Sequence, residues 1–299
     1  MKLPEIKINL LSLIKIAKAI RKYLHDQKVN AGKVKDMCWK KLFGKPDPIP
    51  VPTGVQKKIA LLFAINKYGG NNNLQGCLND QANVASHLPD FEKRLFKDSE
   101  VTTTRFKQEV LKVAEETTSG DMVVLHYSGH GTYTACYDGD ELDGKDEALY
   151  LYNGPLIDDD FGVLLDNFKT GVKVIIFLDS CFSESATRAL NNEPNTKKGR
   201  FKIYKKFVTK KQVPHNKLLP KAINWIVFSG CGEHQTSADA YIGGKFNGAF
   251  TYFLWDCIDR KYTYKQWYAQ LRKSLPSSEY DQIPTLEGPE DLLTKQIFT

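Results

Sequence analysis

The sequence lacks the uninterrupted apolar run that a membrane span requires, which is roughly 18 to 20 residues long. Its most apolar N-terminal stretch, residues 8–20, is broken by Lys15 and Lys18. These charges disfavour a membrane-spanning protein and a clearly secreted one. The chain nevertheless has enough apolar material for a buried core, because 41% of its 299 residues are hydrophobic and 11% are aromatic.

Cysteine is scarce, and its spacing argues against two common uses. The six cysteines form no CxxC pair and no Cys/His arrangement that suggests zinc, and a chain of this length does not need disulfides for stability. They are Cys38, Cys77, Cys136, Cys181, Cys231 and Cys257. We expect reduced thiols in a cytoplasmic protein.

The net charge of +7 is unevenly distributed. Residues 1–58 hold 14 Lys/Arg against 4 Asp/Glu, and residues 197–211 hold eight basic residues and no acid. The remainder carries a net charge of −11. An acidic core with two basic appendages is compatible with a cationic substrate, although net charge alone does not establish specificity.

An N-terminal extension is predicted for residues 1–56. Apolar residues between positions 6 and 24 recur at spacings of three and four, which is typical of an amphipathic helix. Four prolines then alternate with other residues between Gly44 and Gly54, a pattern that neither a helix nor a central strand tolerates. This Pro-rich segment is interpreted as a linker that ends near residue 56.

The rest of the chain, residues 57–299, alternates between short apolar runs and helical patterns. Buried parallel strands are predicted at 58–65, 122–127, 172–178 and 223–228. Helices are predicted at 78–88, 106–117, 159–168, 246–259 and 264–275. The alternation indicates an α/β sandwich, in which functional groups follow the carboxyl ends of the strands.

Two of the predicted strands are followed by residues suited to nucleophilic catalysis. His130 follows the strand at 122–127, and Cys181 follows the strand at 172–178. A thiolate can attack a carbonyl while a nearby imidazole moves the proton, and the N–H groups of Gly131 and Cys181 can hold the oxyanion. A single buried cysteine is usually structural, so the interpretation depends on the pair.

The motifs Tyr127-Ser128-Gly129-His130-Gly131 and Leu178-Asp179-Ser180-Cys181 resemble the paired signatures of caspase-like cysteine peptidases, and the metacaspase branch more closely. Cys181 follows His130 by 51 positions, which agrees with the roughly 50 of a caspase-type interval. Further resemblance lies in residues 74–80, 138–144, 157–160 and 228–239, so that it extends from residue 57 to about 287. The caspase signature Gln-Ala-Cys is absent, which argues against cleavage after aspartate.

The resemblance implies a caspase-hemoglobinase α/β sandwich, with a mostly parallel central sheet flanked by helices, and a cysteine endopeptidase of the type I metacaspase kind. It divides the domain into a large-subunit-like part at 57–195, a processing loop at 196–217 and a small-subunit-like part at 218–299. No third catalytic side chain is required, because a backbone carbonyl can orient the imidazole. The enzyme is expected to be a monomer.

The resemblance also assigns a substrate pocket to Cys77, Asp80, Ser128 and Asp179. Two carboxylates there would select an Arg or Lys before the scissile bond. The alternatives are that Asp80 is an N-cap or first-turn acid of the helix at 78–88, and that Asp179 only shapes a turn.

Many metacaspases need calcium, and the matching carboxylates here are Asp146, Asp158 and Asp159. Calcium prefers six to eight oxygen ligands. Arg188 stands near the place where the family has a fourth acid. As an alternative to calcium, its guanidinium would neutralise the aspartates directly. The acidic loop at 138–147 is otherwise a solvated turn.

The two basic segments have several interpretations. The loop at 197–211 offers eight Lys/Arg sites for self-cleavage, or it is simply a solvated loop. It lacks the aromatic pattern of a nucleic-acid site, so no nucleic-acid partner is expected. The N-terminal helix is interpreted as a regulatory segment, with membrane contact, partner docking or plain packing as alternatives. The rival to an enzyme is a non-catalytic caspase-like scaffold that acts through its basic arm.

Overall fold

The structure is a computed structural model that describes residues 56–135, 145–181, 225–231 and 238–299, and only the backbone of residues 135, 145, 146 and 181. The predicted N-terminal helix, the Pro-rich linker, most of the acidic loop and the basic loop lie outside these residues. The predicted division of the chain at residue 56 and within the domain therefore stays a prediction.

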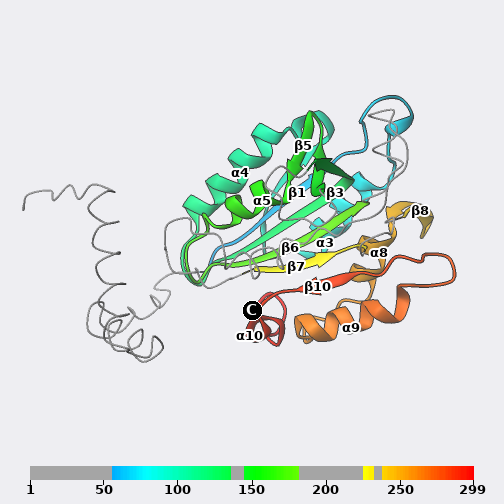
Figure 1. Ribbon diagram of the computed structural model, residues 1–299. Helices are drawn as coiled ribbons and strands as arrows, with labels where there is room; N and C mark the ends of the chain where they lie inside the picture. The colour runs from blue at the N-terminus through cyan, green and yellow to red at the C-terminus, as the bar shows by residue number, and fades with distance from the viewer. Residues whose placement is uncertain (1–55, 136–144, 182–224, 232–237) are drawn as a thin grey trace, which may run out of the picture. The chain divides into compact units, whose positions relative to one another are not determined.

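The central feature is an eight-stranded, mostly parallel sheet (Figure 1). Its main path runs in the order β10-β7-β6-β3-β1-β2, and β10 is antiparallel to β7. The strands are β1 (Lys58–Ala64), β2 (Glu92–Lys97), β3 (Met122–Ala135), β6 (Lys173–Cys181), β7 (Trp225–Ser229) and β10 (Thr285–Glu287). The strands β4 (Lys145–Leu151) and β5 (Gly154–Ile157) extend β3 in an antiparallel arrangement. A separate hairpin joins β8 (Asp239–Ile242) to β9 (Lys245–Gly248).

Helices cover both faces of the sheet, and Figure 1 shows α4 and α5 on one side with α8 and α9 on the other. The helices are α3 (Cys77–His87), α4 (Thr103–Glu116), α5 (Asp158–Leu165), α8 (Ala249–Asp256), α9 (Tyr264–Ser274) and α10 (Glu290–Leu293), with 3-10 turns η1 (Gly70–Asn72) and η2 (Asp98–Glu100). Each face has its own core. The core under α3, α8 and α9 is rich in aromatic rings, where Phe177 packs on Phe228, Trp255 and Trp267. The expected α/β sandwich with a mostly parallel sheet is confirmed.

Local sequence explains where these elements begin. The strand β1 is a continuous apolar run because helices bury it on both faces. The hydroxyl of Thr102 accepts a hydrogen bond from the N–H of Arg105 and caps α4. Thr263 and Gln266 form a reciprocal capping box at the start of α9.

The structure differs from the predicted elements at several places. The strands β3 and β6 continue through the histidine and cysteine motifs, because His130 pairs with Cys181 and residues 131–135 pair with β4. The predicted helix at 246–259 begins later, at Ala249, because residues 246–248 pair with β8. The edge strand β2 was missed, since its charged and largely exposed sequence hides the strand pattern. The short strands β4, β5, β8, β9 and β10 were not predicted either.

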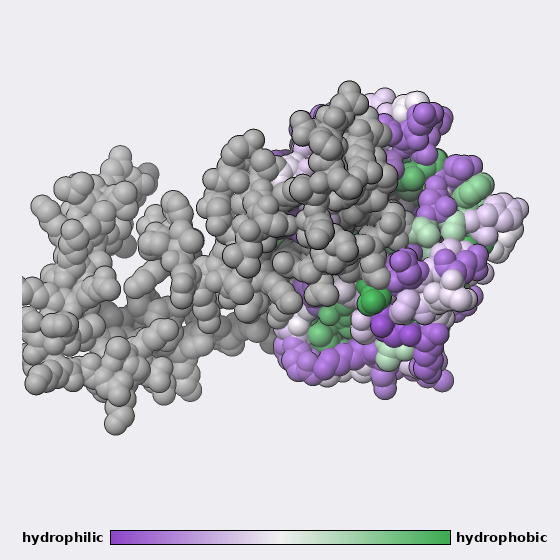
Figure 2. All heavy atoms as spheres, turned by 45° about the vertical axis from the view of Figure 1, so that its right-hand side comes forward, coloured by the Kyte–Doolittle hydropathy of each residue, from purple (hydrophilic) through white to green (hydrophobic). Residues whose placement is uncertain are grey.

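The face of the described residues in Figure 2 is mainly hydrophilic, with small hydrophobic areas between. Within the part of the chain that the structure describes, no helix combines the length and apolarity needed to cross a bilayer.

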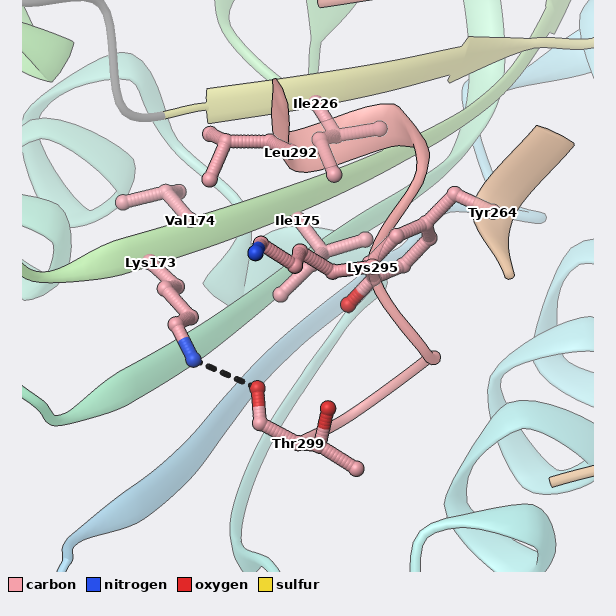
Figure 3. Close-up of a pocket in the computed structure, with 8 residues that line it drawn as sticks. All are labelled: Lys173, Val174, Ile175, Ile226, Tyr264, Leu292, Lys295 and Thr299. Atoms are coloured by element: carbon pink, nitrogen blue, oxygen red, sulfur yellow. Dashed lines mark hydrogen bonds between the residues drawn. The ribbon is translucent and has the colours of Figure 1, made fainter. Parts of the chain in front are cut away.

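A small apolar pocket lies where the C-terminal residues pack on the sheet (Figure 3). The amine of Lys173 donates to the carbonyl oxygen of Thr299 at its rim. The lining residues are Lys173, Val174, Ile175, Ile226, Tyr264, Leu292, Lys295 and Thr299. Since Lys173 begins β6 and Cys181 ends it, this pocket lies about 25 Å from the histidine–cysteine pair.

One polar side chain is buried in the aromatic core. His126 is 1% exposed, and neither ring nitrogen has a hydrogen-bond partner among the described residues. In the sheet it stands between Leu62 and Phe177. Burial lowers the pKa of His126 to about 3, because the core cannot solvate the imidazolium.

Replacing His126 is therefore expected to stabilise the fold in acid. The unfolded chain binds a proton near pH 6.5 and the folded chain does not, so the wild type loses stability as the pH falls from 6.5 towards 3. Between pH 7.5 and pH 5 this loss amounts to about 2 kcal/mol, which His126→Leu should avoid. Urea unfolding at both pH values measures it, with the partly exposed His87→Gln as control. An equal loss in His126→Leu and wild type would contradict the assignment.

Candidate active site

The register of β3 and β6 places the two motifs side by side. In this parallel pair Ser128 is the partner of Asp179, and His130 is the partner of Cys181. Partners on adjacent strands lie about 4.8 Å apart. The backbone therefore brings the predicted base and nucleophile together, inside the strands rather than after them.

The imidazole of His130 is oriented by a backbone carbonyl. Its Nε2 lies 2.7 Å from the carbonyl oxygen of Asn72. A carbonyl only accepts, so Nε2 carries the proton and Nδ1 is the basic nitrogen of the neutral ring. Burial lowers the pKa of His130, against the raising effects of the Asn72 carbonyl and the Asp239 carboxylate, which favours the neutral ring at pH 7.

Two tyrosines hold the His130 backbone, a role that the histidine motif, which contains Tyr127, does not reveal. The hydroxyl of Tyr68 accepts from the His130 N–H at 2.9 Å, and the hydroxyl of Tyr127 donates to its carbonyl at 2.9 Å. The Tyr68 ring also packs on the imidazole, with centroids 4.5 Å apart. Because the hydroxyls approach so closely, a methyl group on Gly129 would lie 2.5 and 2.6 Å from them. This lack of space explains why the residue before His130 is a glycine.

The four residues assigned to the substrate pocket do lie together. Cys77 and Asp80 come from α3, Ser128 from β3 and Asp179 from β6, and all four line one small pocket. The remaining lining residues are Leu74, Gly129, Ala238, Asp239 and Gly248. The pocket adjoins the His130–Cys181 pair, since Ser128 and Asp179 precede these residues by two positions in their strands.

Asp80 is the deepest acid of the pocket, at 1% exposed. Its carboxylate accepts from the Ser128 hydroxyl at 2.8 Å and from the Gly248 N–H at 2.9 Å. It is a first-turn residue of α3, but these bonds point away from its own helix. Burial raises the pKa of Asp80 well above its usual range, and the charge of Asp179 raises it further, while the hydrogen bonds of Ser128 and Gly248 lower it.

The helix α8 supports both pocket acids with its N-terminal amides. Gly248 donates to Asp80, and the Thr251 N–H donates to Asp179 at 3.0 Å. The positive end of the helix dipole thus faces the two carboxylates. Gly248 has to be a glycine, because an added Cβ would overlap the Asp179 carboxylate and lie 2.9 Å from that of Asp80.

Cys77 lies in the pocket wall and is a free, buried thiol. Burial raises its pKa well above the usual range, and the Asp80 charge adds to the effect. Such a thiol stays protonated and is a poor nucleophile. The geometry therefore gives Cys77 a lining role, while the backbone of Cys181 is the one paired with His130.

The residues proposed for calcium gather at one corner of the domain. Asp146 is the partner of Thr134 at the start of β4, while Asp158 and Asp159 open α5. The antiparallel pairing of β4 with β5 brings the two segments alongside each other. No group of three His, Cys, Asp or Glu with metal-binding geometry occurs among the described residues, and Arg188 lies outside them.

The chain is similar to known proteins over most of its length. The profile of the Caspase domain family matches residues 57–293. Among curated proteins, Metacaspase-1 of Pyricularia oryzae is 29% identical over 81% of this chain and 74% of its own length. Metacaspase-1 of Botryotinia fuckeliana is 28% identical over 81% and 70% respectively.

Solved structures show the same fold. The protein GSU0716 of Geobacter sulfurreducens, 28% identical, superposes with a TM-score of 0.60 over 81% of this chain and 98% of that one. Caspase-1 of Spodoptera frugiperda, 11% identical, has a TM-score of 0.53 over 78% and 86%. The chain therefore belongs to the caspase domain family, and it is a metacaspase-like cysteine-type peptidase.

Proposed function

We propose that the protein is an endopeptidase that cleaves after Arg or Lys, with Cys181 as nucleophile and His130 as proton carrier. The observation that carries the proposal is the pocket with Asp80 and Asp179 in its wall, immediately beside this pair. Buried carboxylates are compensated best by a cation with several N–H donors, which an arginine or lysine side chain supplies.

The reaction follows from the placement of the groups. Sγ of Cys181 attacks the scissile carbonyl carbon as His130 Nδ1 takes the thiol proton. The N–H groups of Gly131 and Cys181 stabilise the oxyanion of the tetrahedral intermediate. His130 then protonates the leaving amine, and water activated by the same Nδ1 hydrolyses the thioester to regenerate the thiol. The basic loop at 197–211 offers substrate sites of the same kind, which supports self-processing there.

Peptides that differ only at the residue before the cut are the direct test of specificity. Arg and Lys peptides should be cleaved, and Asp and Ala peptides should not, since only the cations satisfy Asp80 and Asp179. Cys181→Ala should abolish cleavage. The control is Cys257→Ala, which removes a partly buried thiol at the C-terminal end of α8 and should leave cleavage intact. Cleavage that persists in Cys181→Ala would refute the nucleophile, and no wild-type cleavage of any peptide, with or without residues 1–56, would favour a scaffold.

Asp80→Asn should separate function from stability. Loss of one buried carboxylate should lower kcat/KM for basic peptides about 100-fold or more. Because the folded pKa of Asp80 is raised, the folded wild type binds more protons than the unfolded chain above pH 3.8, and its stability falls as the pH rises through that window. The variant lacks this loss, so it should melt at a higher temperature than wild type at pH 7, with a smaller difference at pH 4. A melting temperature of Asp80→Asn below that of wild type at pH 7 would contradict the claim that the buried Asp80 charge destabilises the fold.

We also propose that calcium binds at the corner formed by Asp146, Asp158 and Asp159. Two carboxylates at the start of α5 supply part of the six to eight oxygens, and backbone carbonyls or water would complete them. Calcium should then raise cleavage of an Arg peptide and the melting temperature of wild type, and Asp159→Asn should weaken both responses. The exposed Asp256→Asn is the matched control. Equal responses in Asp159→Asn and wild type would exclude this site.

A further inference from the structure

A third carboxylate stands at the mouth of the pocket. Asp239 opens β8, and its cross-strand partner in the hairpin is Gly248, the residue that lies against both Asp80 and Asp179. Asp239 lines the same pocket as these two acids but is exposed. The pocket is therefore acidic both at its base and at its entrance.

The carboxylate of Asp239 is held in place by the backbone before α3. Its Oδ2 accepts from the Gln75 N–H at 2.7 Å, and its Oδ1 lies 2.5 Å from where a Cβ on Gly76 would be. The absence of a side chain on Gly76 lets the carboxylate approach this segment. Because the same segment leads to Cys77 and Asp80, Asp239 has a fixed position relative to the pocket base.

Asp239 differs from the two buried acids in its partners. Both oxygens of Asp80 and one of Asp179 already accept hydrogen bonds from Ser128 and from the start of α8. Within the part of the chain that the structure describes, Asp239 accepts one backbone hydrogen bond and pairs with no lysine or arginine. Its charge reaches the pocket and the catalytic base, because it raises the pKa values of both Asp80 and His130.

We propose that Asp239 is a specificity-determining residue that favours arginine over lysine in this pocket. The proposal rests on the proposed function. A guanidinium presents five N–H donors in a planar fork and can bond acceptors at the base and the entrance together. An ammonium presents three donors on one atom, which the base of the pocket satisfies. The entrance acid therefore contributes more to binding of arginine.

The test compares three peptides that differ only at the residue before the cut: arginine, lysine and citrulline, the uncharged analogue of arginine. Asp239→Asn keeps an oxygen that can accept from Gln75, removes the charge and replaces the other carboxylate oxygen with an amide NH2 group. Its kcat/KM should fall about tenfold for arginine and less than about threefold for lysine. The citrulline peptide lacks the cation, so wild type and variant should both cleave it poorly. Asp291→Asn removes the same charge from the exposed start of α10 and should change none of the three.

Each outcome separates the inference from the proposed function. An equal fall for the arginine and lysine peptides, or no fall for either, would overturn the role of Asp239 and leave cleavage after basic residues standing. A larger fall for lysine than for arginine would also overturn it. Failure of the wild type to cleave either basic peptide would overturn the proposed function and the inference with it. Thermal unfolding of each variant identifies a loss of activity that comes from misfolding.

Discussion

The active site depends on one constraint, the register between β3 and β6. This register makes partners of Ser128 and Asp179, and of His130 and Cys181. A slip of one residue would turn every side chain of one strand to the opposite face of the sheet. Large side chains on both faces prevent the slip: Phe177 fits among the aromatic rings under α8 and α9, while its neighbours Ile176 and Leu178 belong to the other core.

The pocket shows how function opposes stability in this fold. Two carboxylates are buried where their charges raise the free energy of the folded state, and α8 offsets part of that cost with its first amides. Gly248 permits the arrangement by leaving the carboxylates the space that a side chain would occupy. Under the proposed function, a cationic substrate side chain would offset the remaining cost, so the free pocket would be the less stable state.

Much of this site was predictable from sequence because parallel strands bring their carboxyl ends to one edge. That rule places His130 and Cys181 together without knowledge of contacts, although both strands proved longer than predicted. Tyr68 was not predictable, since nothing in its neighbourhood distinguishes it from any exposed loop tyrosine. The role of Asp239 was not predicted, because each strand of the hairpin that pairs it with Gly248 has only four residues. The second of these strands was also predicted to be part of a helix, since its apolar residue continues the helical spacing of α8. The edge strand β2 has four charged residues among its six, so its sequence lacks the alternation of apolar and polar residues that predicts a strand.

The pocket and its sheet are assembled from both sides of the segment at 182–224. The strand β7, which follows that segment, hydrogen-bonds along β6, which precedes it, over five residue pairs. At the pocket, the hydrogen bond from the Gly248 N–H to Asp80 also links the part of the chain after this segment to the part before it. A break of the peptide chain anywhere between these strands would thus leave the two fragments associated through a shared sheet and two shared cores. The nicked protein would migrate as one particle under native conditions and as two polypeptides in detergent, with its pocket still formed.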